Sequence, residues 1–100
     1  MKTKSGFIDE EILQRAIDTF GMDAQCEMII EECLELALSL QKLKRERGDP
    51  QEKLNNIIDE IADVKIMITQ AERIFPIARI NARIDYKMNR LRKRLNEKQP

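Results

Sequence analysis

Helix-breaking residues at three places divide this chain of 100 residues into four segments, and each segment carries the apolar spacing of an α-helix. The breaks fall at Gly21, at residues 48–50 and at Pro76. The sequence has only three glycines and three prolines, while 42% of its residues are hydrophobic and 36% are charged. A composition with so few turn residues favours helices over strands, so we predict an all-α fold.

The predicted helices cover about residues 10–20, 24–47, 50–74 and 77–96. Asp9 and Asp23 are the expected N-caps of the first two, because an aspartate side chain accepts hydrogen bonds from the free N–H groups of a first turn. Short connections place consecutive helices side by side and antiparallel. We therefore expect one domain over residues 1–100, built as a four-helix antiparallel bundle, with flexible ends at residues 1–6 and 96–100.

Apolar residues predict which face of each helix is buried. The second segment carries two apolar stripes, which indicates burial on two sides, either against a partner subunit or in a thick core of one chain. The first stripe consists of Ile29, Cys33, Leu36, Leu40 and Leu43, and the second of Ile30, Leu34 and Leu38. The third segment is expected to bury Leu54, Ile57, Ile61, Val64, Ile68, Ala71 and Phe75, and the fourth Ile77, Ile80, Ile84, Met88, Leu91 and Leu95.

Two pairs of carboxylates stand three residues apart, Glu32 with Glu35 and Glu60 with Asp63. Residues at this spacing lie on one helix face, with Cβ atoms roughly 5–6 Å apart, where like charges destabilise the helix. Glu35 precedes the turn near Gly48 by about as many residues as Glu60 follows it, so the two pairs reach similar heights on antiparallel helices. The four carboxylates predict a site for a hard divalent cation, with Mg²⁺ as the expected ion and Mn²⁺ as an alternative.

A simpler interpretation is that these carboxylates form an ordinary solvated face, because a single Glu-x-x-Glu motif has almost no specificity. Two pairs at matched height beside dense apolar stripes favour the metal site. The neighbouring Glu31 and Asp59 are either further ligands or plain surface. The chain contains no histidine, which excludes most zinc sites, the di-iron Glu-x-x-His pattern and catalysis by histidine.

Charge is unevenly distributed along a chain whose net charge is zero. Residues 1–50 carry a net charge of −4 and residues 51–100 a net charge of +4, a balance that is not typical of a general nucleic-acid binder. The last segment has a basic ridge that is either a solvated face or, through one or two side chains, a contact for substrate phosphate. This ridge consists of Arg79, Arg83, Lys87, Arg90 and Arg94.

The two cysteines indicate the redox compartment. Cys26 and Cys33 lie ~10.5 Å apart along one predicted helix. A disulfide requires Cα atoms ~4.4–6.8 Å apart, so this pair cannot form one. The sequence shows neither a signal peptide nor an apolar run of about 18 residues. We therefore expect a cytoplasmic protein without a membrane partner.

The acidic motifs resemble those of the MazG-like all-α nucleoside triphosphate pyrophosphohydrolases, in particular their short single-domain members. The family pattern of Glu-x-x-Glu, a spacer of about two dozen residues, and Glu-x-x-Asp is similar to residues 32–35 and 60–63. Residues around these motifs match as well, namely Phe20, Gly21 and Gln25 before them and Tyr86, Lys87, Arg90 and Leu91 near the end. The resemblance covers about residues 20–95.

This resemblance implies Mg²⁺-dependent hydrolysis of the α–β phosphoanhydride bond of a (d)NTP, giving the (d)NMP and pyrophosphate, in a role such as nucleotide-pool house-cleaning. The implied metal ligands and catalytic residues are Glu32, Glu35, Glu60 and Asp63, one of which would orient or deprotonate the attacking water. The further candidates for contacts with the nucleotide and its phosphates are Gln25, Lys87 and Arg90. Family members assemble as dimers or tetramers, so a homodimer or homotetramer is expected.

The alternative function is a non-catalytic helical protein-interaction module. In that case the carboxylates are surface charge, and the two-sided second helix is a docking face. Such a module would not gain stability from Mg²⁺, whereas a protein whose native state binds the ion would.

Overall fold

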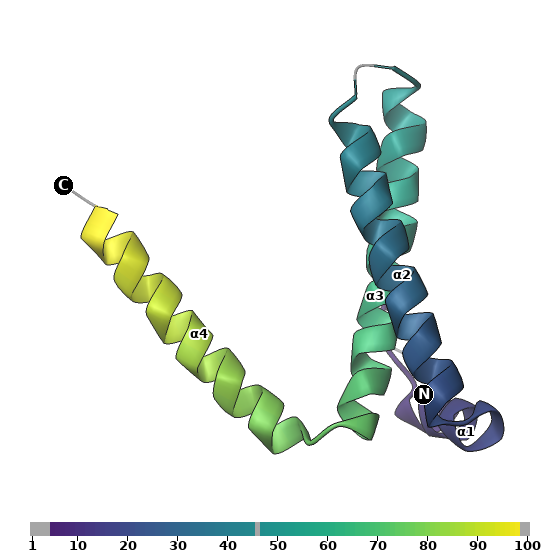
Figure 1. The fold of residues 1–100 in the computed structure, drawn as a ribbon. Helices are drawn as coiled ribbons and strands as arrows, with labels where there is room; N and C mark the ends of the chain where they lie inside the picture. Colours follow the sequence, from purple (N-terminus) through teal and green to yellow (C-terminus); the bar gives the residue numbers. More distant parts are fainter. Residues whose placement is uncertain (1–4, 46, 99–100) are drawn as a thin grey trace.

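The computed structural model of the protein describes residues 5–45 and 47–98, and within these ranges it is all-α, with four helices and no strand (Figure 1). The helices are α1 (Glu10–Phe20), α2 (Met22–Leu43), α3 (Pro50–Ile74) and α4 (Ile77–Lys98). The predicted all-α, four-helix fold is confirmed. Of the ends predicted to be flexible, residues 1–4 and 99–100 lie outside the described residues, and residues 96–98 continue α4.

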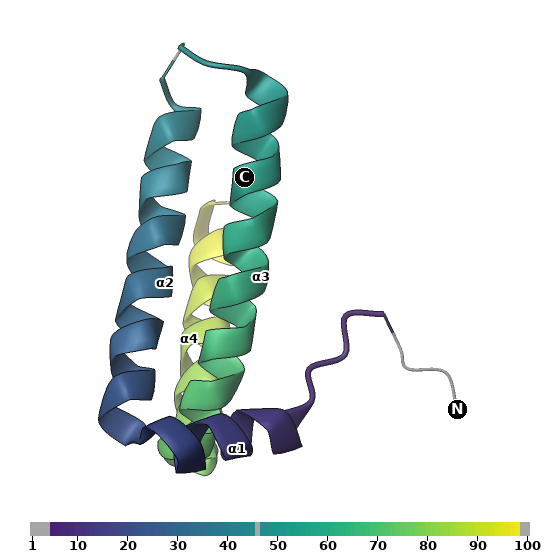
Figure 2. The ribbon, with the colours of Figure 1, turned by 90° about the vertical axis from the view of Figure 1, so that its right-hand side faces the viewer.

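Helices α2 and α3 form an antiparallel pair joined by the turn at the top of Figure 1. Helix α1 crosses the other end of this pair and packs against both of its helices (Figure 2). Nowhere in the two described ranges is there a helix both long and apolar enough to cross a lipid bilayer.

Local sequence signals explain where most of the helices begin and end. The Asp9 carboxylate accepts hydrogen bonds from the backbone N–H groups of Glu11 at 3.1 Å and Ile12 at 3.4 Å, and Asp49 caps α3 in the same way. Gly21, with φ of 93°, ends α1. The same glycine is the N-cap of α2, because its carbonyl accepts from the N–H of Gln25 at 3.2 Å.

Helix α2 differs from its predicted bounds at both ends. It begins at Met22, so Asp23 lies in the first turn rather than at the N-cap, because Gly21 already connects the two helices. It ends at Leu43 rather than near Arg47. The backbone N–H of Lys44 bonds to the carbonyl of Gln41, three residues back, and this tighter spacing ends the α-helical ladder.

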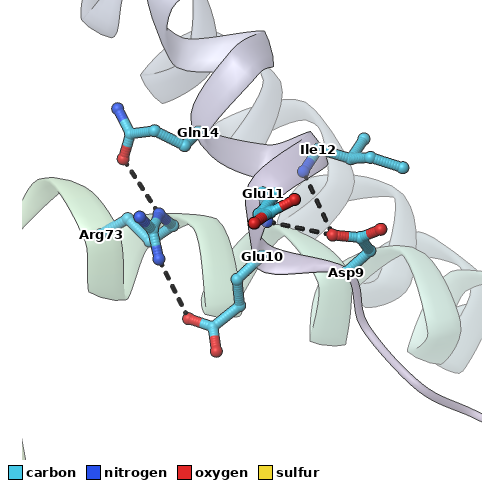
Figure 3. A network of polar contacts seen from close by, with 6 residues as sticks. All are labelled: Asp9, Glu10, Glu11, Ile12, Gln14 and Arg73. Atoms are coloured by element: carbon cyan, nitrogen blue, oxygen red, sulfur yellow. Dashed lines mark hydrogen bonds and ion pairs between the residues drawn. The ribbon is translucent and has the colours of Figure 1, made fainter.

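A polar network anchors α1 to α3 (Figure 3). The Arg73 guanidinium donates to the side-chain oxygen of Gln14 at 2.9 Å and pairs with the Glu10 carboxylate at 3.3 Å. Leu13, on the same helix, is 7% exposed. The apolar contact and the polar network together hold α1 across the end of the α2–α3 pair.

The seam between α2 and α3 is more polar than the sequence predicts. Its buried residues include Ile57 and Met67 but also three polar residues, Gln25, Ser39 and Gln70. Part of the stripe expected to be buried on α3 is exposed, namely Leu54, Ile61, Ile68 and Phe75. That part of the prediction is wrong for the single chain, because two packed helices bury only a narrow strip of each other.

Helix α4 projects away from the other helices, and within the described part of the chain its backbone approaches that of α3 alone (Figure 1). The stripe expected to be buried on α4 is therefore largely exposed, with Ile84 50% and Leu95 55% exposed. The second stripe of α2, formed by Ile30, Leu34 and Leu38, is exposed as well. Burial of these stripes was predicted from helical periodicity, which identifies an apolar face but not the surface that covers it.

The cap at Asp49 gives a test of this local structure. Replacing Asp49 by Ala removes the acceptor for the N–H of Gln51, 3.1 Å away, and should lower the free energy of unfolding by about 1 kcal/mol. Urea denaturation measures this change. Asp85→Ala, at an exposed position inside α4, is the matched control and should be nearly neutral; an equal loss in both variants would contradict the capping role.

Candidate metal centre

Three of the four predicted carboxylates converge in the middle of the α2–α3 pair. Glu32 lies on α2, and Glu60 and Asp63 lie on α3. One carboxylate oxygen from each of these residues lies within 4.8 Å of the other two. Antiparallel packing brings the two motifs to the same height, as their distances from the turn predicted.

Glu35 stands at the edge of this group. Its side chain is exposed, and it lines a hollow next to the group together with Glu60. Its negative charge also raises the pKa values of Glu32 and Glu60, which places it close to both. The neighbouring Glu31 and Asp59 are exposed and lie outside the converging group.

Two oxygens of the group are buried without a hydrogen-bond partner. These are Oε2 of Glu32 and Oε2 of Glu60, on side chains that are otherwise half-buried. A buried polar atom without a partner costs free energy, and the cost is greater for a charged group. The two orphaned oxygens therefore fit a site for a cation or a hydrogen-bond donor.

The electrostatics of the group are unfavourable without a cation. Burial raises the pKa of Glu32, and the charges of Asp63, Glu35 and Glu60 raise it further. Burial also raises the pKa of Glu60, with additional effects from Glu35 and Asp63. Both effects disfavour the ionised form of each carboxyl group.

The group fits a hard divalent cation such as Mg²⁺. Mg²⁺ binds oxygen ligands at about 2.0–2.1 Å, so two oxygens on one ion lie up to about 4 Å apart. The present spread of 4.8 Å needs only a small rotation of side chains. Glu32, Glu60 and Asp63 could hold such an ion directly, and Glu35 lines the same hollow as Glu60.

The three residues predicted to contact the substrate lie apart from this group in the single chain. Gln25 is on α2, ~10.5 Å along the axis from Glu32, and only 2% of it is exposed. Lys87 and Arg90 are on the projecting α4 and are exposed. The Arg90 guanidinium lies 5.8 Å from the centre of the Tyr86 ring, a cation–π contact within α4.

Residues that the sequence did not single out also border the site. Lys42 and Lys53, with Asn56, line the same hollow as Glu35 and Glu60. The sequence does contain a signal for them. Lys42 follows Glu35 by as many residues as Lys53 precedes Glu60, so the two lysines lie level on antiparallel helices. In the sequence, the basic ridge of the last helix is instead the predicted candidate for phosphate contact.

Searches against protein-family models, curated proteins and solved structures found no match to this chain.

The crowded carboxylates predict an unusual pH dependence of stability. The pKa values of Glu32 and Glu60 are higher in the folded state than in the unfolded chain. At a pH between the unfolded-state and the folded-state pKa, the folded state therefore binds more protons than the unfolded state. Their contribution therefore favours folding at lower pH and is lost as pH rises through the folded-state pKa values. In metal-free protein, Glu60→Gln should raise the free energy of unfolding relative to wild type.

The gain in the free energy of unfolding of Glu60→Gln should be larger at about pH 7 than at about pH 5, as measured by urea denaturation in the presence of a chelator. Glu27→Gln, at an exposed position elsewhere on α2, removes the same charge and should give a small change that varies little with pH. A destabilised Glu60→Gln protein at neutral pH would contradict the repulsion described for the cluster.

Proposed function

We propose that this protein is a Mg²⁺-dependent nucleoside triphosphate pyrophosphohydrolase that converts a (d)NTP and water to the (d)NMP and pyrophosphate. The observation that carries the proposal is the convergence of Glu32, Glu60 and Asp63, with two buried oxygens that lack partners. The resemblance of these motifs to MazG-like enzymes supplies the reaction. A cytoplasmic location belongs to the proposal, and the two free cysteines are compatible with it.

The chemistry is hydrolysis of a phosphoanhydride. Bound Mg²⁺ would position the phosphate oxygens and neutralise the charge that develops on them. The oxygen of water forms a bond to the α-phosphorus while the bond to the bridging oxygen breaks, and pyrophosphate leaves with the electron pair. A carboxylate of the cluster accepts the proton of the water. A raised pKa makes Glu32 and Glu60 stronger bases than an ordinary glutamate.

Assembly as a homodimer or homotetramer is part of the proposal. It is supported by the exposed apolar stripes of α2 and α4, because extended apolar faces in water are typical of protein interfaces. Complementary charge also supports it. Helix α4 carries eight Lys or Arg residues and two Asp or Glu residues, whereas the first half of the chain is acidic, so α4 of one copy would attract the acidic half of another. In an assembly, α4 of one copy would bring Lys87 and Arg90 to a substrate held by another.

The activity is tested with a panel of NTPs and dNTPs, including modified ones, scored for monophosphate and pyrophosphate. At least one should be hydrolysed in the presence of Mg²⁺ and none after chelation. Replacing Glu60 by Gln together with Asp63 by Asn should lower the rate by about 100-fold or more, because two ligands and their charges are lost. Glu27→Gln with Asp85→Asn is the charge-matched control and should retain activity.

Hydrolysis that survives in the Glu60→Gln and Asp63→Asn protein would eliminate the assigned site. The alternative, a non-catalytic interaction module, is favoured by the exposed apolar stripes. It predicts no product with any nucleotide and no rise in melting temperature with Mg²⁺. The proposed enzyme should melt at a higher temperature with Mg²⁺, and the double variant should lose that rise.

The assembly is tested by sedimentation of wild type and of a variant with Ile84→Glu and Leu91→Glu, two exposed residues of the α4 stripe. Wild type should sediment as a dimer or tetramer, and the variant should shift toward monomer because it places charges in the interface. Asn89→Glu, exposed on another face of α4 about 140° around the helix from Ile84, is the control and should keep the wild-type assembly. Wild-type protein that stays monomeric at all concentrations would contradict this part of the proposal.

A further inference from the structure

A hollow in the groove between α2 and α3 joins the carboxylates to a pair of lysines. It has a volume of about 170 Å³ and is lined by Glu35 and Glu60 at one end and by Lys42 and Lys53 at the other. A second hollow of about 350 Å³ continues toward the α2–α3 turn and shares Lys42, Lys53 and Asn56 with the first. The two hollows form one trough that runs from the candidate metal centre to the turn.

The lysines flank this trough from opposite sides. Lys42 is two helical turns beyond Glu35 on α2, and Lys53 is two turns before Glu60 on α3, so antiparallel packing sets them level. Side chains of a helix lean toward its N-terminus. Lys42 therefore leans back toward the carboxylates, while Lys53 leans toward the turn, and their ammonium groups are spread along the trough.

Lys53 is held in position before any ligand binds. Its ammonium group donates a hydrogen bond to the backbone carbonyl of Arg45, beyond the end of α2. The turn leaves room for this arrangement, since a Cβ on Gly48 would lie 3.3 Å from Cε of Lys53. An ammonium group has three N–H donors, so two remain for a ligand in the trough.

The charges in the trough do not neutralise one another directly. Among residues 5–45 and 47–98, the one ion pair is Arg73 with Glu10, so neither lysine pairs with Glu35 or Glu60. Ammonium groups next to a cation site weaken the binding of the cation, and carboxylates weaken the binding of a free anion. A divalent cation at the carboxylates together with extended negative charge at the lysines would satisfy both ends.

We infer that this trough is the subsite for the phosphate chain of the substrate, with the departing pyrophosphate bound between the metal at the carboxylates and the ammonium groups of Lys42 and Lys53. The inference rests on the proposed pyrophosphohydrolase function and adds to it the direction in which the phosphate chain lies. Asn56 lines both hollows, and its amide can donate to a phosphate oxygen. The nucleoside would then extend from the opposite side of the carboxylates.

The test uses inorganic pyrophosphate as the probe and titration calorimetry of the full chain with and without Mg²⁺. Wild type should bind pyrophosphate in the presence of Mg²⁺ and much more weakly in its absence. Lys42→Met with Lys53→Met should weaken the Mg²⁺-dependent binding at least about tenfold, because two charge-assisted contacts are lost. Mg²⁺ alone should bind this variant as tightly as wild type or more tightly, which also shows that the variant is folded.

Two controls separate local contacts from net charge. Lys44→Met with Lys93→Met removes the same charge from residues that do not line the trough, and pyrophosphate binding should stay within about twofold of wild type. Lys53→Arg in the Lys42→Met background should restore part of the lost affinity, since Arg keeps the charge and the donors. Equal weakening in both double variants, or no weakening in either, would overturn the inference.

Nucleotide kinetics distinguish this inference from the function on which it rests. If wild type hydrolyses a nucleotide and the Lys42→Met and Lys53→Met protein has the same KM and kcat, the subsite is wrong and the enzyme assignment stands. If wild type hydrolyses none and binds no pyrophosphate with Mg²⁺, both are wrong. The expected result is a KM raised at least about tenfold in that variant and unchanged in the control.

Discussion

Repulsion among carboxylates in the α2–α3 groove opposes the packing of α2 against α3. Glu32, Glu60 and Asp63 meet there, and two of their oxygens are buried without partners. The packing that must offset this cost is thin, because the buried apolar residues are Leu13, Ile57 and Met67 among those that the structure describes. Neutralisation by a divalent cation would remove the repulsion, so metal binding and folding stability should be coupled in this protein.

The thin core and the exposed apolar stripes have the same cause. A chain of 100 residues can bury roughly two-thirds of its unfolded surface, but here one helix of four projects from the others and leaves its apolar face in water. Assembly with further copies would cover those stripes and bring the basic α4 to the acidic groove of another chain. The proposed oligomer is thus a consequence of how little one chain can bury.

Along the α2–α3 groove, Glu35 and Glu60 are followed by Lys42 and Lys53. The continuation toward the turn is lined by charges of both signs, Arg45 and Arg47 with Asp49 and Glu52. The carboxylates followed by the two lysines match a phosphate chain bound to a cation at one end and to ammonium groups at the other. The geometry comes from antiparallel packing, which sets residues equally far from the turn side by side. One turn position therefore determines both the candidate metal centre and the proposed phosphate subsite.

The four helices, the cap at Asp9 and the matched height of the two acidic motifs follow from the sequence alone, because they depend on local hydrogen bonding and on distance along the chain. The cap predicted at Asp23 is wrong, since Gly21 takes that place. Only the tertiary structure decided which part of each apolar stripe is buried. It put Gln25 and Gln70 into the α2–α3 seam and left Ile61 and Ile68 in water. Helical periodicity gives a face of about 100° or more, whereas a neighbouring helix covers a narrow strip of that face. For the same reason, the burial of Glu32 and Glu60, on which the candidate metal centre depends, could not be obtained from their spacing alone.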